Sequence, residues 1–292
     1  MRGIASPRLA ERAAAWRRSL ATRLAEAAAR WSLTVEGPLA EGETAARVFA
    51  VQRPDGAAAV LKLAPPGQGL EAEATALNGF AGQGAARLLA ADLALGALLV
   101  ERLMPGTPLR QLAECDEDAA TLAAAEVMCR LRRPPPPGAV LADAAGWVRA
   151  LDRAAEAPGP LPRPMLARAA ALMRDLAATA PPPVLLHGDL HDRNILRDRA
   201  HGWRAVDPKG LIGDPAFEAA AFLRNPPTDA GAAPVSMARR IALLAEATGL
   251  PRERIAAWGY AGAALAAAWA VEDGSDPARW CVSVEAIAPS LS

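Results

Sequence analysis

Lysine is nearly absent from this sequence. Of the 32 basic residues, only Lys62 and Lys209 are lysines, and the rest are arginines. A compact ammonium group and a planar guanidinium group are not interchangeable. A chain that uses arginine almost everywhere is therefore expected to keep lysine where an ammonium group is needed; biased codon usage with chance survivors is the alternative. Asparagine and histidine are also scarce, with three residues each: Asn78, Asn194, Asn225, His187, His191 and His201.

Cysteine is scarce, and neither sign of charge is in excess. The three cysteines, Cys115, Cys129 and Cys281, are odd in number and widely spaced. They match neither a disulfide framework nor a zinc site, which favours a reducing cytosol. Basic and acidic residues are balanced at 32 each. The chain therefore carries no electrostatic footprint for nucleic acid or for an anionic membrane surface.

The sequence also lacks a long apolar segment that would target or span a membrane. Its beginning carries arginines but no apolar run before a small-residue cleavage site, so we expect no secretory signal. The stretch from Ala256 to Val271 is apolar, but it is too short to span a bilayer comfortably and predicts a buried helix. We therefore expect a cytoplasmic protein that binds neither nucleic acid nor membrane.

The order of predicted elements divides the chain into two parts. With 292 residues, 52% of them hydrophobic, the chain suits one two-lobed unit or two packed domains. Apolar periodicity and turn signals predict helices over residues 7–31 and 70–80. They predict strands over residues 45–52, 58–63, 87–93 and 97–103. Beyond residue 106 we expect mainly helices, over residues 118–132, 143–156, 164–179, 215–223, 235–248, 251–271 and 277–287. The prediction is an α+β fold with a small β-rich N-lobe over residues 1–103 and a larger, mainly helical C-lobe over residues 104–292.

The most informative segment is His187-Gly-Asp-Leu-His-Asp-Arg-Asn194, followed by Asp207-Pro-Lys-Gly. Asp189 and Asn194 stand five residues apart, which is the spacing of a kinase catalytic loop, where the aspartate is the base and the asparagine a metal ligand. Asp207 ends an apolar strand after a short hairpin, so a second carboxylate is expected to return beside the loop. These are the groups that phosphoryl transfer requires.

A cation for the nucleotide phosphates is expected at Lys62. This residue ends the apolar strand Ala58-Ala-Ala-Val-Leu-Lys, and Glu73 on the following helix would form the ion pair that holds such a lysine in place. Glu71 is the competing partner, and a solvated strand end is the alternative for Lys62 itself.

Two other classes of protein compete with a kinase. His187, Asp189 and His191 have the H-x-D-x-H spacing of a metal site, which would fit a zinc or iron hydrolase. Such a site needs further ligands, and the remaining histidine, His201, falls in a predicted hairpin turn. A pseudokinase that only binds nucleotide is the second rival, although every catalytic part is present.

Longer motifs resemble those of the aminoglycoside phosphotransferase superfamily, in its streptomycin 6-phosphotransferase and hydroxyurea phosphotransferase branch. The likeness rests mainly on HGDLHDRNIL at residues 187–196 and on AVDPKGLIGDPAFEAAAFLRNP at residues 205–226. Shorter segments that support it are LLVERLMPG at 98–106, AVLKL at 59–63, EATALNGF at 73–80 and AWAVEDG at 268–274. The resemblance begins near residue 35 and implies a protein-kinase-like two-lobed fold with a small antiparallel sheet in the N-lobe.

The resemblance also implies a role for individual residues. Asp189 would be the catalytic base, Asn194 and Asp207 the magnesium ligands, and Lys62 with Glu73 the group on the α- and β-phosphates. The remaining expected positions are Thr44 in a loop that grips the β-phosphate, the adenine hinge from Glu101 to Leu103, and loop support at His187 and Asp214. Lys209 would reach the transferred phosphate or the substrate, or form a surface ion pair, and Trp269, Glu272 and Asp273 are candidates for the substrate pocket. Asp192 and Arg193 depart from the family pattern and add two opposite charges beside the loop.

The expected activity is transfer of the γ-phosphate of ATP, with Mg²⁺, to a hydroxyl of a small molecule. The resemblance favours streptomycin, a cationic aminocyclitol derivative, for which an acidic pocket could form from Asp214, Glu218, Glu272 and Asp273. Hydroxyurea, an amino alcohol or a sugar remains the alternative acceptor, and the expected assembly is a monomer or weak dimer.

Overall fold

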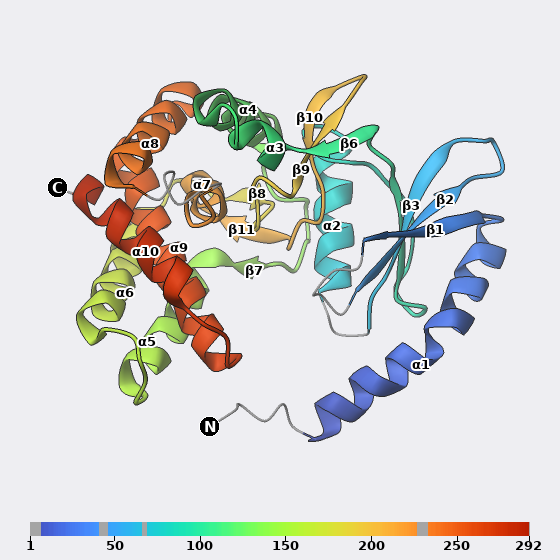
Figure 1. Ribbon diagram of the computed structural model, residues 1–292, viewed down its shortest axis with the longest axis horizontal. Helices are drawn as coiled ribbons and strands as arrows, with labels where there is room; N and C mark the ends of the chain where they lie inside the picture. The colour runs from blue at the N-terminus through green and yellow to red at the C-terminus, as the bar shows by residue number, and fades with distance from the viewer. Residues whose placement is uncertain (1–6, 41–45, 66–68, 227–232, 292) are drawn as a thin grey trace.

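The structure is a computed structural model that describes residues 7–40, 46–65, 69–226 and 233–291. A small β-rich lobe and a larger helical lobe lie side by side, and the chain passes from the first to the second once (Figure 1). The mixture of one antiparallel sheet and a separate group of helices is the α+β class that the sequence predicts. No helix among the described residues is both long and apolar enough to cross a membrane.

The smaller lobe is built on a five-stranded antiparallel sheet with strand order β1-β2-β3-β5-β4. Its strands are β1 (Thr34–Ala40), β2 (Arg47–Gln52), β3 (Ala58–Leu63), β4 (Leu88–Asp92) and β5 (Ala97–Glu101). Helix α1 (Pro7–Arg30) covers one face of the sheet and α2 (Leu70–Phe80) lies against the other (Figure 1).

Alternation along β3 sorts its side chains between these two faces. Leu61 and Leu63 are fully buried in the cluster that includes Trp16 of α1. Lys62 therefore points to the opposite face, where α2 lies. The lysine reaches the interior of the molecule because of strand periodicity alone.

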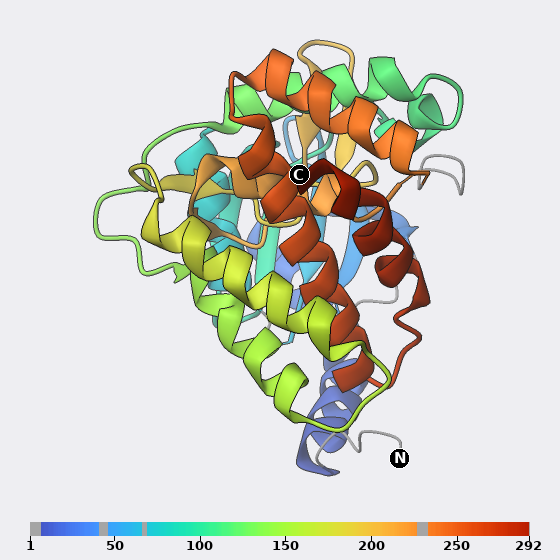
Figure 2. The same cartoon turned by 90° about the vertical axis from the view of Figure 1, so that its left-hand side faces the viewer.

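The larger lobe packs its helices around α9. Its helices are α3 (Leu109–Ala113), α4 (Glu117–Leu131), α5 (Val148–Glu156), α6 (Arg163–Ala178), α7 (Glu218–Leu223), α8 (Pro234–Thr248), α9 (Arg252–Glu272) and α10 (Ala278–Ile287). Every residue of α9 from Ile255 to Ala268 is buried, and Figure 2 shows this helix passing between α6 and α10. A helix that is buried all round accounts for the long alanine-rich apolar run, which does not cross a membrane.

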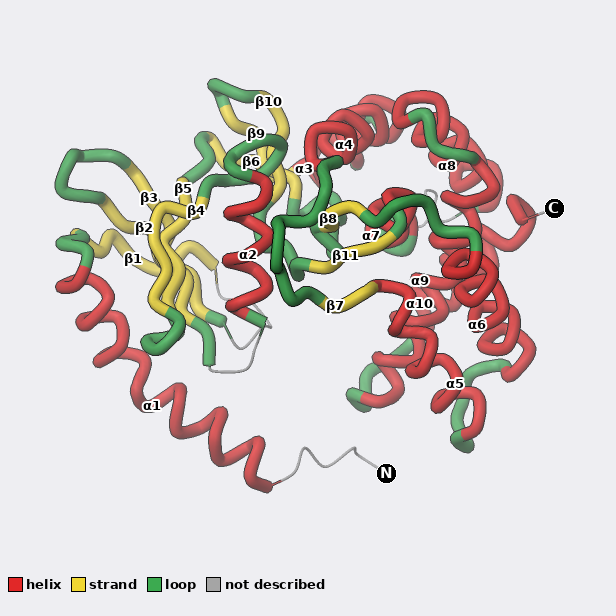
Figure 3. The backbone as a smooth tube through the Cα atoms, turned by 180° about the vertical axis from the view of Figure 1, so that it is seen from behind, coloured by secondary structure: helices red, strands yellow, loops and turns green. Residues whose placement is uncertain are grey.

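Two small sheets carry the loops between the lobes. One has the order β10-β9-β6 and the other β7-β11-β8. Their strands are β6 (Pro105–Pro108), β7 (Ala142–Asp143), β8 (Val184–Leu186), β9 (Ile195–Asp198), β10 (Gly202–Ala205) and β11 (Leu211–Gly213). Residues 187–194 connect β8 to β9, and residues 206–210 connect β10 to β11. Figure 3 shows α2 standing between the five-stranded sheet and the strands β8 and β11.

Some elements differ from the expectation. Strands β1 and β6 and the short helix α3 were not predicted, because their segments contain glycine and proline and show no clear apolar period. The helix expected over 143–156 begins instead as a 3₁₀ turn over Ala144–Trp147, capped by the Asp143 carboxylate, and becomes α-helical at Val148.

Candidate active site

A cleft of about 790 Å³ opens between the five-stranded sheet, α2 and the two connecting loops. Its walls come from β2, β3, α2, the 100–110 connection and the segments 193–196 and 206–209. Seven of the residues predicted from the sequence line this cleft: Lys62, Glu73, Glu101, Leu103, Asn194, Asp207 and Lys209. Thr44 lies outside the described residues.

Lys62 joins two carboxylates that are far apart in the sequence. Its Nζ donates to Oε2 of Glu73 at 2.6 Å and also to Oδ1 of Asp207. Glu73, and not the exposed Glu71, occupies this position. Burial alone would lower the pKa of Lys62, but the two carboxylates outweigh burial and raise it. The ammonium group is therefore held in its charged form inside the cleft.

Asp207 has an unusual backbone conformation. Its φ is 60°, in the left-handed region that a non-glycine residue rarely adopts. The chain on either side explains the turn: Val206 N–H donates to the Asn194 carbonyl at 2.9 Å, and Gly210 passes so close to α2 that a Cβ would lie 2.2 Å from the Ala72 carbonyl oxygen. Burial acts to raise the pKa of Asp207, but Lys62 and Lys209 outweigh it and the pKa is lowered. Asp207 is therefore a carboxylate that faces the cleft.

Asp189 lies in the other connection, between β8 and β9, which also carries Asn194. One carboxylate oxygen, Oδ1, accepts a hydrogen bond from Nη2 of Arg224 at 2.7 Å, and Oδ2 lies 3.8 Å from Nζ of Lys209. The side-chain amide of Asn194 donates to the Asp189 backbone carbonyl at 3.0 Å. The loop therefore closes on itself and places the two residues of the predicted pair next to each other.

The loop over residues 187–194 is braced by Glu218 and not by Asp214. Both carboxylate oxygens of Glu218 accept backbone N–H bonds, from His187 at 3.0 Å and from Gly188 at 2.9 Å. The expectation for Asp214 is therefore wrong: its carboxylate turns into the helical core, where it accepts from Trp258 Nε1 at 2.7 Å and from Arg254. Burial raises the pKa of Glu218 to about 7, although the two N–H donors oppose this.

His187 links the loop to the segment that carries Asp207. Its Nε2 lies 2.8 Å from the Val206 carbonyl, and its Nδ1 accepts the Asp189 backbone N–H at 3.2 Å. Burial lowers the pKa of His187 to about 4, so the ring is neutral and Nε2 carries the proton that is donated to Val206. With both ring nitrogens engaged, His187 cannot act as a metal ligand, and the H-x-D-x-H hydrolase site is wrong. Among the described residues no cluster of three His, Cys, Asp or Glu side chains could hold a metal ion.

The donors that remain near Lys62 do fit magnesium. The amide nitrogen of Asn194 is taken by the Asp189 carbonyl, which leaves its oxygen as the group available to a cation. Asp207 contributes a carboxylate, and both residues line the cleft. Hard oxygen donors of this kind, few in number and open to phosphate and water, suit Mg²⁺ better than a softer metal.

The segment from Glu101 to Leu103, which was expected to be the hinge, lines part of the cleft. The Glu101 carboxylate accepts from Nη2 of the buried Arg204 at 2.8 Å and from the Arg87 N–H at 3.1 Å. Burial opposes these contacts, but they prevail and lower the pKa of Glu101. Leu103 is buried beside it. The Glu101 side chain is therefore occupied, which leaves the backbone of the hinge to meet a ligand.

The expected substrate-pocket residues do not line this cleft. Trp269 packs edge-on against Trp147, with ring centroids 5.1 Å apart, and Glu272 lies 3.7 Å from Arg153 on the exposed surface. Asp273 is exposed at the end of α9. The proposed acidic pocket is wrong in part: Asp214 and Glu218 are buried and fully engaged in internal hydrogen bonds.

One residue of the site, Arg224, was not predicted from the sequence, and another, Glu218, was predicted in a different role, as part of an acidic pocket. Arg224, on the carboxylate of Asp189, and Glu218, on the loop backbone, both lie inside the long motif at residues 205–226. The motif could have drawn attention to them. No spacing rule relates an arginine to an aspartate 35 positions earlier, so the contact itself was not predictable.

Comparison with known proteins finds similar sequences over most of the chain. Residues 30–274 match the model of a family described as aminoglycoside/hydroxyurea antibiotic resistance kinase. The chain is 39% identical over 247 residues to a hydroxyurea phosphotransferase of Kitasatospora aureofaciens, covering 82% of this chain and 70% of that protein. It is 36% identical over 278 residues to a streptomycin 6-kinase of Streptomyces glaucescens, covering 92% of this chain and 89% of the relative.

A solved structure shares the fold at lower identity. An aminoglycoside phosphotransferase, in a ternary complex with ADP and hygromycin B, superposes with a TM-score of 0.61 and 17% identity. The match covers 89% of this chain and 96% of the other. The kinase-like two-lobed fold that the motifs imply is thereby confirmed.

Proposed function

Because the chain belongs to the family of aminoglycoside/hydroxyurea antibiotic resistance kinases, we propose that it transfers the γ-phosphate of ATP to a hydroxyl group of streptomycin. The motif-based resemblance is confirmed by this membership. The relatives support this choice of acceptor, since a protein that is 36% identical over almost its whole length is named a streptomycin 6-kinase.

The observation that carries the proposal is the contact of Lys62 with both Glu73 and Asp207 inside the cleft. A lysine held between two carboxylates is placed to bind the α- and β-phosphates of a nucleotide. Asn194 and Asp207 would hold Mg²⁺, which supplies positive charge to the phosphate oxygens when bound. The hinge at residues 101–103 would receive the adenine at its backbone.

Asp189 is the residue proposed to act on the acceptor. Its Oδ2 would accept a hydrogen bond from the attacking hydroxyl and take up the hydroxyl proton as the oxygen–phosphorus bond forms and ADP leaves. Positioning and charge stabilisation provide most of the catalysis in such a reaction, because little covalent chemistry falls to the protein.

Hydroxyurea is the second candidate acceptor. The relative that is 39% identical is named a hydroxyurea phosphotransferase, and none of the described residues that line the cleft demands a large cationic acceptor. A choline-, homoserine- or sugar-type acceptor is a further outcome of the same experiment.

The test is a coupled ADP-release assay of the pure protein with ATP and Mg²⁺ against streptomycin, hydroxyurea, choline, homoserine and a sugar panel. We expect streptomycin to give the highest kcat/KM, and mass spectrometry to show one added phosphate on the antibiotic. Asp189→Asn should lower kcat by at least about 10³-fold and leave nucleotide binding intact by titration calorimetry. Turnover of the acceptor by Asp189→Asn at the wild-type rate would refute the assigned mechanism. Activity with hydroxyurea and not with streptomycin would make hydroxyurea the acceptor in place of streptomycin.

A further inference from the structure

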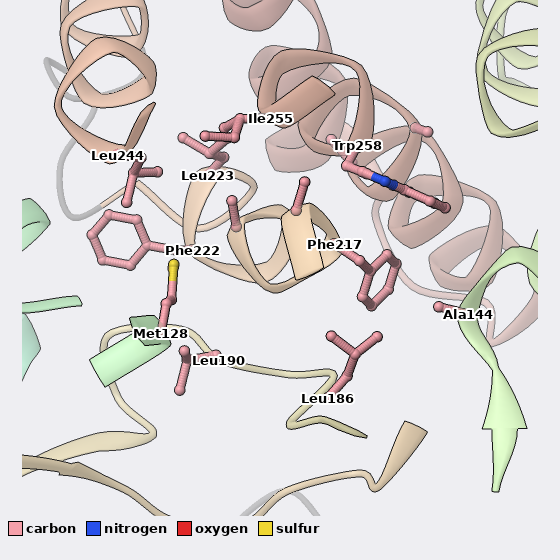
Figure 4. Close-up of a cluster of buried hydrophobic side chains, with 14 of the residues drawn as sticks. Met128, Ala144, Leu186, Leu190, Phe217, Phe222, Leu223, Leu244, Ile255 and Trp258 are labelled. Atoms are coloured by element: carbon pink, nitrogen blue, oxygen red, sulfur yellow. The ribbon is translucent and has the colours of Figure 1, made fainter. Parts of the chain in front are cut away.

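Helix α7 is short, fully buried and tightly fixed. All six residues from Glu218 to Leu223 are buried, and Figure 4 shows Phe222 and Leu223 packed among side chains of α4, α8 and α9. Two glycines of α9 permit the close approach. A Cβ at Gly259 would lie 2.8 Å from Cδ1 of Leu223, and one at Gly262 would lie 2.8 Å from Cβ of Ala220. The helix therefore has almost no freedom to shift.

Both ends of this helix contact the catalytic loop. Glu218, its first residue, holds the backbone N–H groups of His187 and Gly188, as described above. Arg224, the residue that follows its last turn, donates to the Asp189 carboxylate at 2.7 Å. Six helical residues span roughly 9 Å at 1.5 Å each. Helix α7 thus holds the loop at two separate points, one on its backbone and one on its reactive side chain.

Arg224 is itself held in place, by burial of its side chain and by a hydrogen bond to its backbone. Only 14% of its side chain is exposed, and its backbone carbonyl accepts a hydrogen bond from Oγ of Ser283 on α10 at 3.2 Å. Burial lowers the pKa of Arg224, with the Asp189 carboxylate opposing that change, and a guanidinium keeps its charge in a protein. Lys209, the other cation near Asp189, is half exposed and 3.8 Å away, so it cannot fix the carboxylate in the same way.

We propose that Arg224 is a positioning residue that fixes Oδ1 of Asp189 and thereby presents Oδ2 to the acceptor hydroxyl. The inference rests on the proposed function and adds a component to it. The terminal torsion of an aspartate is broad and roughly two-fold, so an unrestrained carboxylate presents either oxygen over a range of angles. A buried charged hydrogen bond to one oxygen removes that freedom. In-line attack depends on this alignment, and a misplacement of 1 Å is enough to cost about 10²-fold in rate.

Three variants test the proposal with one matched control. Arg224→Lys keeps the charge and loses the planar fork, Arg224→Gln removes the charge, and Arg224→Ala opens a space that free guanidinium ion can enter. Arg239→Gln is the control, because Arg239 forms an exposed ion pair with Asp118 elsewhere on the same lobe. For the Gln and Ala variants we expect kcat to fall about 10- to 100-fold, while KM for ATP changes less than about two-fold, since Lys62 and Asp207 are untouched. The kcat of Arg224→Lys should lie between those of the Gln and Ala variants and that of the wild type. Free guanidinium ion should restore part of the activity of Arg224→Ala.

A purely structural role makes different predictions. An unchanged kcat in Arg224→Gln would overturn the proposal, and so would a loss that appears in KM for ATP or that follows a drop in Tm. Absence of rescue by guanidinium in a folded Arg224→Ala would also count against it. Absence of phosphoryl transfer to any acceptor in the wild type refutes the proposed function, and a wild-type rate in Asp189→Asn refutes the mechanism assigned to it. An inactive Asp189→Asn beside a fully active Arg224→Gln refutes only this inference.

A readout that does not depend on turnover is the crystal structure of Arg224→Gln. A rotated Asp189 carboxylate, or one in two conformers, supports the proposal. An Asp189 side chain unchanged from the wild type overturns it.

Discussion

The pH dependence of stability should reveal two buried groups that act in opposite directions. Glu218 has a pKa of about 7 in the folded protein against an ordinary value of 4.5. Its folded form therefore retains a proton that the unfolded chain has already lost between these pH values. The stabilisation that this proton gives is fully present below about pH 4.5 and is lost as pH rises to about 7. A difference of this size corresponds to about 3 kcal/mol.

His187 makes the opposite contribution. Its pKa is about 4 in the folded protein against an ordinary value of 6.5. The unfolded chain binds a proton there that the folded protein excludes, so stability rises by about 3 kcal/mol as pH increases from about 4 to 6.5. In the wild type the two effects nearly cancel between about pH 4.5 and 6.5. Replacement of one group should expose the other.

The perturbation is Glu218→Gln, followed by urea unfolding monitored by circular dichroism at four pH values from 4.5 to 7.5. The free energy of unfolding of this variant should rise with pH across the acid range, because the His187 effect is no longer offset. The destabilisation relative to the wild type should be greatest at pH 4.5 and smaller by about 3 kcal/mol at pH 7.5. Glu285→Gln, at an exposed glutamate of α10, controls for the loss of one carboxylate.

A difference in the free energy of unfolding between wild type and Glu218→Gln that stays flat or grows with pH would contradict a raised pKa of Glu218. Growth with pH would mean that the two backbone N–H donors from His187 and Gly188 outweigh burial and favour the ionised carboxylate. The pKa of Glu218 would then be lowered in the folded protein, and the loop would be held by a permanent charge.

Two further substitutions probe the cleft and the packing behind it. Lys62→Met should weaken nucleotide binding by at least about 10-fold in titration calorimetry, because it removes the cation and leaves Glu73 and Asp207 to repel the phosphates. Lys62→Arg should bind the nucleotide with an affinity between those of Lys62→Met and the wild type, since the guanidinium does not fit the two-carboxylate site. Unchanged affinity in Lys62→Met would contradict the nucleotide site. Gly262→Val should destabilise the fold by about 1–3 kcal/mol in urea unfolding, because a Cβ there would lie 2.8 Å from Cβ of Ala220. Gly159→Val is the control, because Gly159 has open space around it and no left-handed backbone conformation. Equal stability of Gly262→Val and wild type would show that α7 is not tightly held.

Strand periodicity and spacing were sufficient for much of the local structure. The apolar run over residues 58–63 predicted the strand that carries Lys62, and the five-residue spacing of Asp189 and Asn194 predicted one loop for both. These features depend on neighbours in the chain, so they are visible without a fold. Strands β1 and β6 were missed because proline and glycine interrupt them and pairing with other strands, not local preference, makes them extended.

Which carboxylate braces the loop over residues 187–194 could not be decided from neighbouring residues in the sequence. Asp214 and Glu218 are four residues apart and both follow β11, so either could face the loop on sequence grounds. The 3₁₀ turn from Pro215 to Phe217 rotates the chain between them. Asp214 is thereby turned toward Trp258 and Glu218 toward His187.

The family, the kinase-like fold and the residue types that phosphoryl transfer needs could be read from the amino-acid sequence, because they depend on the order of motifs and on short-range spacing. Which groups meet could be known only from the folded chain: Lys62 contacts Asp207 across 145 positions, and Arg224 contacts Asp189 across 35. Contacts of this kind follow from the packing of α2 and α7 against the connecting loops. That packing is the sum of many small steric and apolar contributions, so no single pair of residues in the sequence predicts it.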